Sequence, residues 1–118
     1  MKETEKMLHV PLDIATFEQK ASEVALLLKT LANRRRLMLL CKLVEHGELS
    51  VGQLADEIGL SQSALSQHLA LLRAEGLVAF ERDAQTLRYR IADPRVEALL
   101  GHLYQIYCAK DGANGGTE

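Results

Sequence analysis

The chain has 118 residues, 47% of them hydrophobic, and a formal net charge of −2 at pH 7. This length allows one modest core, so we expect a single folded domain. No apolar run reaches the roughly 20 residues that cross a bilayer, and the charged start, Met1 to Lys6, does not lead into a signal-peptide core. The composition therefore argues against a membrane protein and predicts a soluble, cytoplasmic one.

Two helices are predicted ahead of the centre of the chain. Residues 1–14 have mixed charge without a period and are expected to form a flexible arm. Apolar residues at helical spacing predict a helix over 16–31. A second helix is predicted over 34–45, with Asn33 as its N-cap and Gly47 at its end. Its expected inward positions are Leu37, Leu40, Cys41 and Val44.

Residues 50–78 predict two helices joined by a tight turn. Ser50 is placed to cap the first helix, Gly59 supplies the left-handed position that ends it, and Ser61 is placed to cap the second. The second helix has an inward stripe of Leu65, Leu69 and Leu72. This order and spacing are typical of a helix-turn-helix.

The outward side of the second helix carries short polar side chains at its leading end. These residues are Gln62, Ser63, Ser66 and Gln67. Glutamine and serine can form hydrogen bonds with base edges in the major groove, and His68 and Arg73 could reach phosphates. The alternative is that these residues only solvate a helix face. Because all of them occur together in a helix-turn-helix, the pattern favours DNA binding.

A β-hairpin is predicted directly after this helix pair. Residues 77–82 and 87–91 alternate between apolar and polar, with a tip at 83–86. Val78 and Phe80 are expected to share the buried face with the apolar residues of the second strand. Arg88 and Arg90 are expected on the exposed side, and Arg82 adds a third cation. Such a wing places cations along the phosphate backbone and positions the protein more than it specifies sequence.

The net charge is unexpected for a DNA-binding protein, because Lys and Arg usually neutralise phosphates. Five basic residues nevertheless occur without an acid between positions 29 and 42, namely Lys29, Arg34, Arg35, Arg36 and Lys42. The simpler interpretation of Arg34 to Arg36 is a solvated helix start that need not face DNA. We therefore expect weak non-specific binding with marked salt sensitivity.

A last helix is predicted from Asp93, with Pro94 at its first position. It is apolar around most of its circumference. The first and last helices together carry more apolar surface than one small domain can cover, which predicts a two-fold homodimer. The predicted fold is mainly α with a small β-hairpin, a winged helix-turn-helix of order α-α-α-α-β-β-α. It spans 15–108 and is followed by a disordered tail over 109–118.

The two cysteines, Cys41 and Cys108, are 67 positions apart, and neither belongs to a local metal motif. Each could be a small core residue. A structural disulfide is not expected in a reducing cytosol, whereas a reversible one is plausible if the fold brings the two helices together. Neighbouring residues do not indicate which thiol would react first.

The stretch LSQSALSQHLALLRAEGLV, within the predicted order of elements, resembles the ArsR family of bacterial winged-helix repressors over about residues 17–103. The resemblance implies dimerisation through the first and last helices. It also makes Gln62, Ser63, Ser66, Gln67 and His68 the candidates for DNA contact.

The chain differs from the metal-sensing members of that family at the positions of their metal ligands. Ser50 and Gly52 stand where arsenic and cadmium sensors carry cysteines, and on the last helix only His102 with Asp93 or Glu97 could serve a zinc or nickel site. The pair Cys41 and Cys108 instead resembles the persulfide-responsive branch, of the BigR and SqrR type. That resemblance implies that reactive sulfur bridges the two thiols, releases DNA and derepresses genes for sulfide detoxification.

The resulting hypothesis is a dimeric repressor of double-stranded operator DNA, an imperfect palindrome, controlled by Cys41 and Cys108. No cofactor, metal or membrane contact is expected. The first alternative is a metal-responsive repressor. A thiol oxidoreductase is disfavoured because the chain lacks a Cys-X-X-Cys motif, and an interaction module without DNA binding is supported only by the acidic net charge.

Overall fold

The computed structural model describes residues 11–109, and the chain divides into two units, 1–32 and 33–118. Most of the predicted arm and tail lies outside the described residues. Within them, Ile14 already belongs to a helix and Ala109 ends the last helical turn. No helix in the described part of the chain is long and apolar enough to cross a membrane.

The first unit contains one helix, α2 (Ile14–Leu31). It begins two residues before the sequence prediction because Asp13 caps it, accepting hydrogen bonds from the Thr16 backbone N–H at 3.3 Å and the Thr16 hydroxyl at 2.7 Å. Much of the expected apolar stripe is exposed in the single chain: Ala21 and Ala25 are exposed and 53% of the surface of Leu28 is accessible, whereas Leu31 is buried. Half of the surface of Leu26, outside that stripe, is also accessible.

The second unit begins with α3 (Arg34–His46), which starts as predicted and ends one residue later. The Asn33 side-chain oxygen accepts from the Arg36 backbone N–H at 3.0 Å, and Gly47 has a φ of +83°. The predicted inward face is only partly right, because the fully buried residues are Leu39, Leu40 and Leu43. Since α3 contains consecutive apolar residues, its periodicity fits two neighbouring faces, and packing against α4 and β3 selects one of them.

The helix-turn-helix consists of α4 (Val51–Ile58) and α5 (Gln62–Ala74). Ser50 forms a reciprocal capping box with Gln53. Gly59 then adopts the left-handed conformation at φ +70°, and the Ser61 hydroxyl accepts from the third residue of α5. All three predicted inward leucines of α5, Leu65, Leu69 and Leu72, are buried. The sequence prediction of this motif is confirmed.

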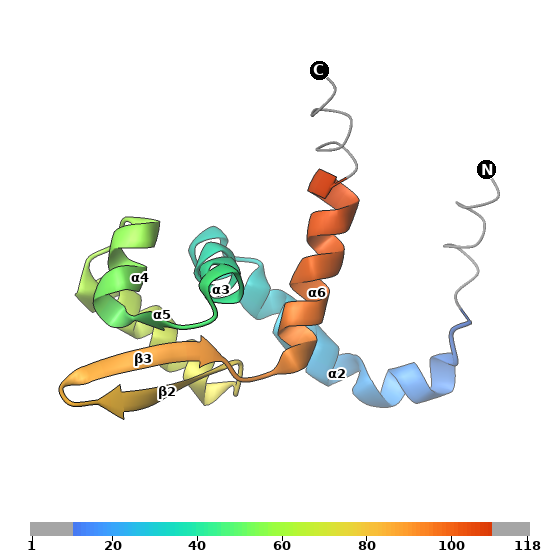
Figure 1. Cartoon of the computed structure of the whole chain (residues 1–118). Coiled ribbons are helices and arrows are strands. Elements are labelled where there is room, and N and C mark those ends of the chain that lie inside the picture. The colour runs from blue at the N-terminus through green and yellow to red at the C-terminus, as the bar shows by residue number, and fades with distance from the viewer. Residues whose placement is uncertain (1–10, 110–118) are drawn as a thin grey trace, which may run out of the picture. The chain divides into compact units, whose positions relative to one another are not determined.

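The sheet has three antiparallel strands in the order β1-β3-β2, which are Leu49–Ser50, Thr86–Ile91 and Val78–Asp83. The hairpin of β2 and β3 runs alongside α5 and α4 (Figure 1). Its register pairs Phe80 with Tyr89. The loop is the dipeptide Ala84–Gln85, shorter than the predicted four-residue tip, and Ala84 has a φ of +58°. The short strand β1, which pairs with β3, was not predicted.

The last helix, α6 (Pro94–Tyr104), continues as a π-helical turn, η1 (Gln105–Ala109), where a regular helix was predicted. The Asp93 carboxylate accepts from the Arg95 backbone N–H at 2.9 Å, as a cap should. Val96 and Leu100 are buried. The second unit therefore has the predicted architecture, a mainly helical winged helix-turn-helix.

Candidate nucleic-acid interface and thiol pair

The leading end of α5 presents a polar surface to solvent. The side chains of Gln62, Ser63, Ser66 and Gln67 are exposed, while Leu65, Leu69 and Leu72 of the same helix are buried. The Gln62 side-chain amide nitrogen lies beside Gly52 of α4. A Cβ atom added to this glycine would be 3.9 Å from that nitrogen. Exposed amides and hydroxyls at the start of a recognition helix can donate to and accept from base edges.

His68, the next predicted contact residue, is partly buried on α5. Burial lowers the pKa of its imidazole, and the positive charges of Arg36 and Arg35 lower it further. The lowered pKa favours the neutral imidazole in the free chain. In that form His68 can contribute a hydrogen bond to DNA.

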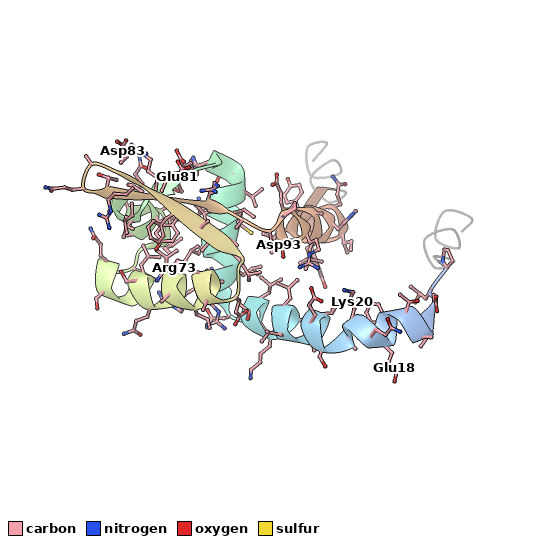
Figure 2. The ribbon with its side chains drawn as sticks, turned by 90° about the horizontal axis from the view of Figure 1, so that it is seen from below. Glu18, Lys20, Arg73, Glu81, Asp83 and Asp93 are labelled. Carbon is pink, nitrogen blue, oxygen red and sulfur yellow. The ribbon has the colours of Figure 1, made fainter. Side chains whose placement is uncertain are left out.

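Arg73, near the end of α5, forms a bridge to the hairpin. Its guanidinium donates to the Tyr89 hydroxyl at 2.7 Å and lies 5.4 Å from the centre of the Phe80 ring. The two rings contact each other, with centroids 5.3 Å apart. Figure 2 shows Arg73 where α5 faces the hairpin. The sequence predicted a phosphate contact for Arg73, and the structure gives this side chain a role in joining the helix to the wing.

This bridge, which we call the Arg73 cluster (Arg73, Phe80 and Tyr89), was missed at the sequence level. Phe80 and Tyr89 follow the apolar alternation of the strands and were assigned to the hydrophobic face. Arg73 and Tyr89 are 16 positions apart in the chain, too far for a local sequence signal. The cross-strand pairing of Phe80 with Tyr89 is what brings the three side chains together.

The wing cations lie on both faces of the hairpin. The register places Arg88 and Arg90 opposite Glu81 and Ala79, and Arg82 on the other face opposite Leu87. The Arg88 Nε lies 3.7 Å from a carboxylate oxygen of Asp83, near the hairpin tip (Figure 2). Within residues 11–109, neither Arg82 nor Arg90 forms an ion pair, so both are available for phosphates.

Cys41 and Cys108 are both free thiols. Cys41 lies on α3 and is partly buried, and this burial raises the pKa of its thiol. Cys108 lies in η1 and is exposed. The two thiols therefore differ in access to solvent, a difference that the sequence did not indicate.

The described residues of this single chain contain no group of three histidine, cysteine, aspartate or glutamate side chains that could hold a metal ion. Asp93, one of the candidate ligands, also forms an ion pair with Arg95 at 2.9 Å. Its carboxylate is thus engaged both as a helix cap and in a charge pair.

Comparisons with known proteins agree with this architecture. Residues 33–79 match the model of the family described as bacterial regulatory protein, arsR family. The biofilm growth-associated repressor of Agrobacterium fabrum is 44% identical over 113 residues, which cover 92% of this chain and 96% of that protein. The transcriptional activator HlyU of Vibrio cholerae is 45% identical over 98 residues, or 83% of this chain and 90% of HlyU.

The crystal structure of the transcriptional repressor BigR from Xylella fastidiosa superimposes with a TM-score of 0.77 at 45% identity, covering 83% of this chain and 99% of that one. These relatives are transcriptional regulators, which excludes the thiol oxidoreductase alternative. The chain belongs to the ArsR family of bacterial DNA-binding transcriptional regulators.

Proposed function

We propose that this chain is a homodimeric repressor that leaves its operator when reactive sulfur bridges Cys41 and Cys108. The observation that carries the proposal is the placement of the two thiols. Cys41 lies on α3, which packs against α4 of the helix-turn-helix, and Cys108 lies in η1 at the far end of the fold. A bridge between them would tie the end of the chain to the helix that supports the DNA-reading pair.

The exposed thiol of Cys108 is the one that a persulfide in solution reaches first. Its thiolate attacks the outer sulfur of R–S–SH, which forms Cys108–S–SH and releases R–SH. The Cys41 thiolate then attacks the Cys108 Sγ and expels HS⁻, leaving a disulfide. The persulfide is the oxidant, and hydrogen sulfide is the reduced product. Closing a loop of this length stabilises the bridged form by about 4 kcal/mol on the chain-entropy model.

Dimerisation is supported by the exposed apolar residues of α2 and of the chain end. Phe17, Leu26 and Leu28 are each at least half accessible on α2, and Tyr104, Ile106 and Tyr107 are more than half accessible at the other end. A two-fold dimer presents two recognition helices to an imperfect palindrome. The regulated genes would serve sulfide detoxification. Three relatives named biofilm growth-associated repressors support repression. HlyU is named an activator, so the test below must establish that DNA binding represses transcription.

The proposal is tested by a mobility-shift assay with operator DNA selected from a random duplex library. Glutathione persulfide should dissociate the wild-type complex, and dithiothreitol should restore it. Cys41→Ser and Cys108→Ser should bind DNA normally but no longer respond. The intact mass then distinguishes a direct disulfide from a bridge with added sulfur. A persulfide response that survives in both single variants would rule out the bridge.

A further inference from the structure

A cavity of about 370 Å³ lies between the first three turns of α3 and the end of α4. Its lining contains Arg34, Arg35 and Lys42 from α3, Glu57 from α4, and the apolar side chains of Met38 and Ile58. All of these residues belong to the second unit. The cavity is separate from the polar face of α5 and from the wing.

Within this cavity, one cation is already neutralised and two are not. Lys42 lies 3.1 Å from a Glu57 carboxylate oxygen, and a second carboxylate, Glu45, is 3.7 Å away. These carboxylates raise the pKa of the Lys42 ammonium. In the described part of the chain, Arg34 and Arg35 form no ion pair and are exposed. The rim of the cavity thus carries two uncompensated positive charges.

The cavity borders the start of the recognition helix. Gly59, which also lines it, is followed within two residues by Ser61, the cap of α5. The positive charge of Arg35 is also close enough to lower the pKa of His68 in the middle of α5. Arg35, with Arg34 next to it in the chain, therefore lies near α5, the predicted DNA-reading helix.

The recognition helix itself has only one arginine or lysine for the DNA backbone. Over Gln62–Ala74 its only arginine or lysine is Arg73, which is engaged with Tyr89. Phosphate neutralisation supplies most non-specific affinity for DNA, and the chain as a whole carries a net charge of −2. A single cation on α5 leaves most of the charge for the backbone beside it to other elements.

We propose that Arg34 and Arg35 form a phosphate-binding subsite, in which a backbone phosphate of the duplex docks at the rim of the α3–α4 cavity. This subsite extends the DNA interface from α5 onto the start of α3. It rests on DNA binding, the family function, but not on the thiol switch.

The test uses Arg34→Gln, Arg35→Gln and a matched control, Arg95→Gln, which removes the same charge from α6. Binding to a fluorescein-labelled, mixed-sequence duplex is measured by anisotropy between about 50 and 200 mM salt. Each of the first two variants should weaken binding, and the slope of log K against log salt should become shallower by about 0.9 for each phosphate that is no longer neutralised. Arg95→Gln should leave the slope unchanged, and circular dichroism should show all three folded.

Wild-type slopes in both α3 variants would overturn the subsite and leave the thiol switch intact. The subsite would also be wrong if the cavity takes a free anion. In that case inorganic phosphate would raise the melting temperature of the wild type but not of the glutamine variants, with duplex binding unaffected. If the wild-type protein bound no duplex at all, the result would instead contradict its function as a DNA-binding regulator.

Discussion

Two regions of the second unit differ in whether their apolar side chains are buried or exposed. In the reading unit (residues 51–91), the leucines on the inner faces of α4 and α5 pack inside the chain, and Leu54, Leu65 and Leu72 are completely buried. In the terminal segment (residues 104–109), Tyr104, Ile106 and Tyr107 are more than half exposed. The reading unit therefore completes its core within one chain, whereas the terminal segment leaves its apolar surface for something else to cover.

The strongest test of this comparison is truncation of a leucine inside the reading unit. Leu69 is 1% exposed, whereas Leu71, two residues away on the same helix, is 39% exposed. Leu69→Ala should lower the free energy of unfolding by about 2–5 kcal/mol, because it removes buried surface and leaves a cavity. Leu71→Ala should cost less than about 1 kcal/mol. Urea denaturation measures both, and equal losses would mean that α5 is not anchored by this stripe.

The next test places a charge in the terminal segment. Ile106→Asp should weaken self-association at least about tenfold, since a carboxylate would be buried without a partner in an apolar interface. Sedimentation velocity over a range of concentrations measures this effect. Glu97→Gln on α6, which also changes one charge, should have no such effect. An unchanged dimer in Ile106→Asp would show that the exposed terminal segment is not the interface.

A smaller effect is expected where the reading unit is joined to the wing. Tyr89→Phe removes only the hydroxyl that accepts from Arg73, and should cost about 1–1.5 kcal/mol of stability, at the lower end for a bond to a charged group because Arg73 is partly solvated. The same change in an Arg73→Gln background should cost much less. Chemical denaturation of the four proteins gives the coupling. If the stability losses of the two single variants simply added up in the double variant, the hydrogen bond would contribute nothing to the attachment of the wing.

The hairpin loop offers a stabilising change. Ala84 has a φ of +58°, a left-handed conformation that costs a residue with a Cβ about 1–2 kcal/mol. Ala84→Gly removes this cost, but the greater entropy of the unfolded chain lowers stability by about 0.4–1 kcal/mol. The net gain in the free energy of unfolding should therefore be about 0.5 kcal/mol. Thermal unfolding measures this gain in stability. Gln85→Gly, at the other loop residue, serves as the comparison. A loss of stability would contradict the strained turn.

Local chemistry explains which features could be predicted from the sequence. Ser50, Gly59 and Ser61 act on their own neighbours in the chain, so the helix-turn-helix could be placed to within a residue. The stripe of α3 was misplaced because consecutive apolar residues fit more than one face. Strand β1 has only two residues, and its pairing with β3 depends on contacts about 40 positions away, which no local pattern reports.

The candidate site was predictable to the same degree. The exposed polar residues of α5 follow directly from the leucine stripe, because the two sets occupy opposite sides of one helix. The Arg73 cluster and the α3–α4 cavity could not be found in this way, because each combines residues from separate elements. The contacts of Arg73 with Tyr89 and Phe80 depend on the hairpin register, whereas its predicted phosphate contact stays a prediction.

The smallest expected effect concerns the protonation of His68 within the reading unit. Burial and the charges of Arg36 and Arg35 lower the pKa of this histidine in the folded chain, so between pH 6.5 and that lower value the unfolded chain binds more protons. The contribution of His68 to stability is therefore complete above pH 6.5 and is lost as the pH falls through the folded value. His68→Gln should flatten the stability profile over this interval in urea titrations. A profile that stays equally steep without His68 would assign the acid sensitivity of the reading unit to other groups.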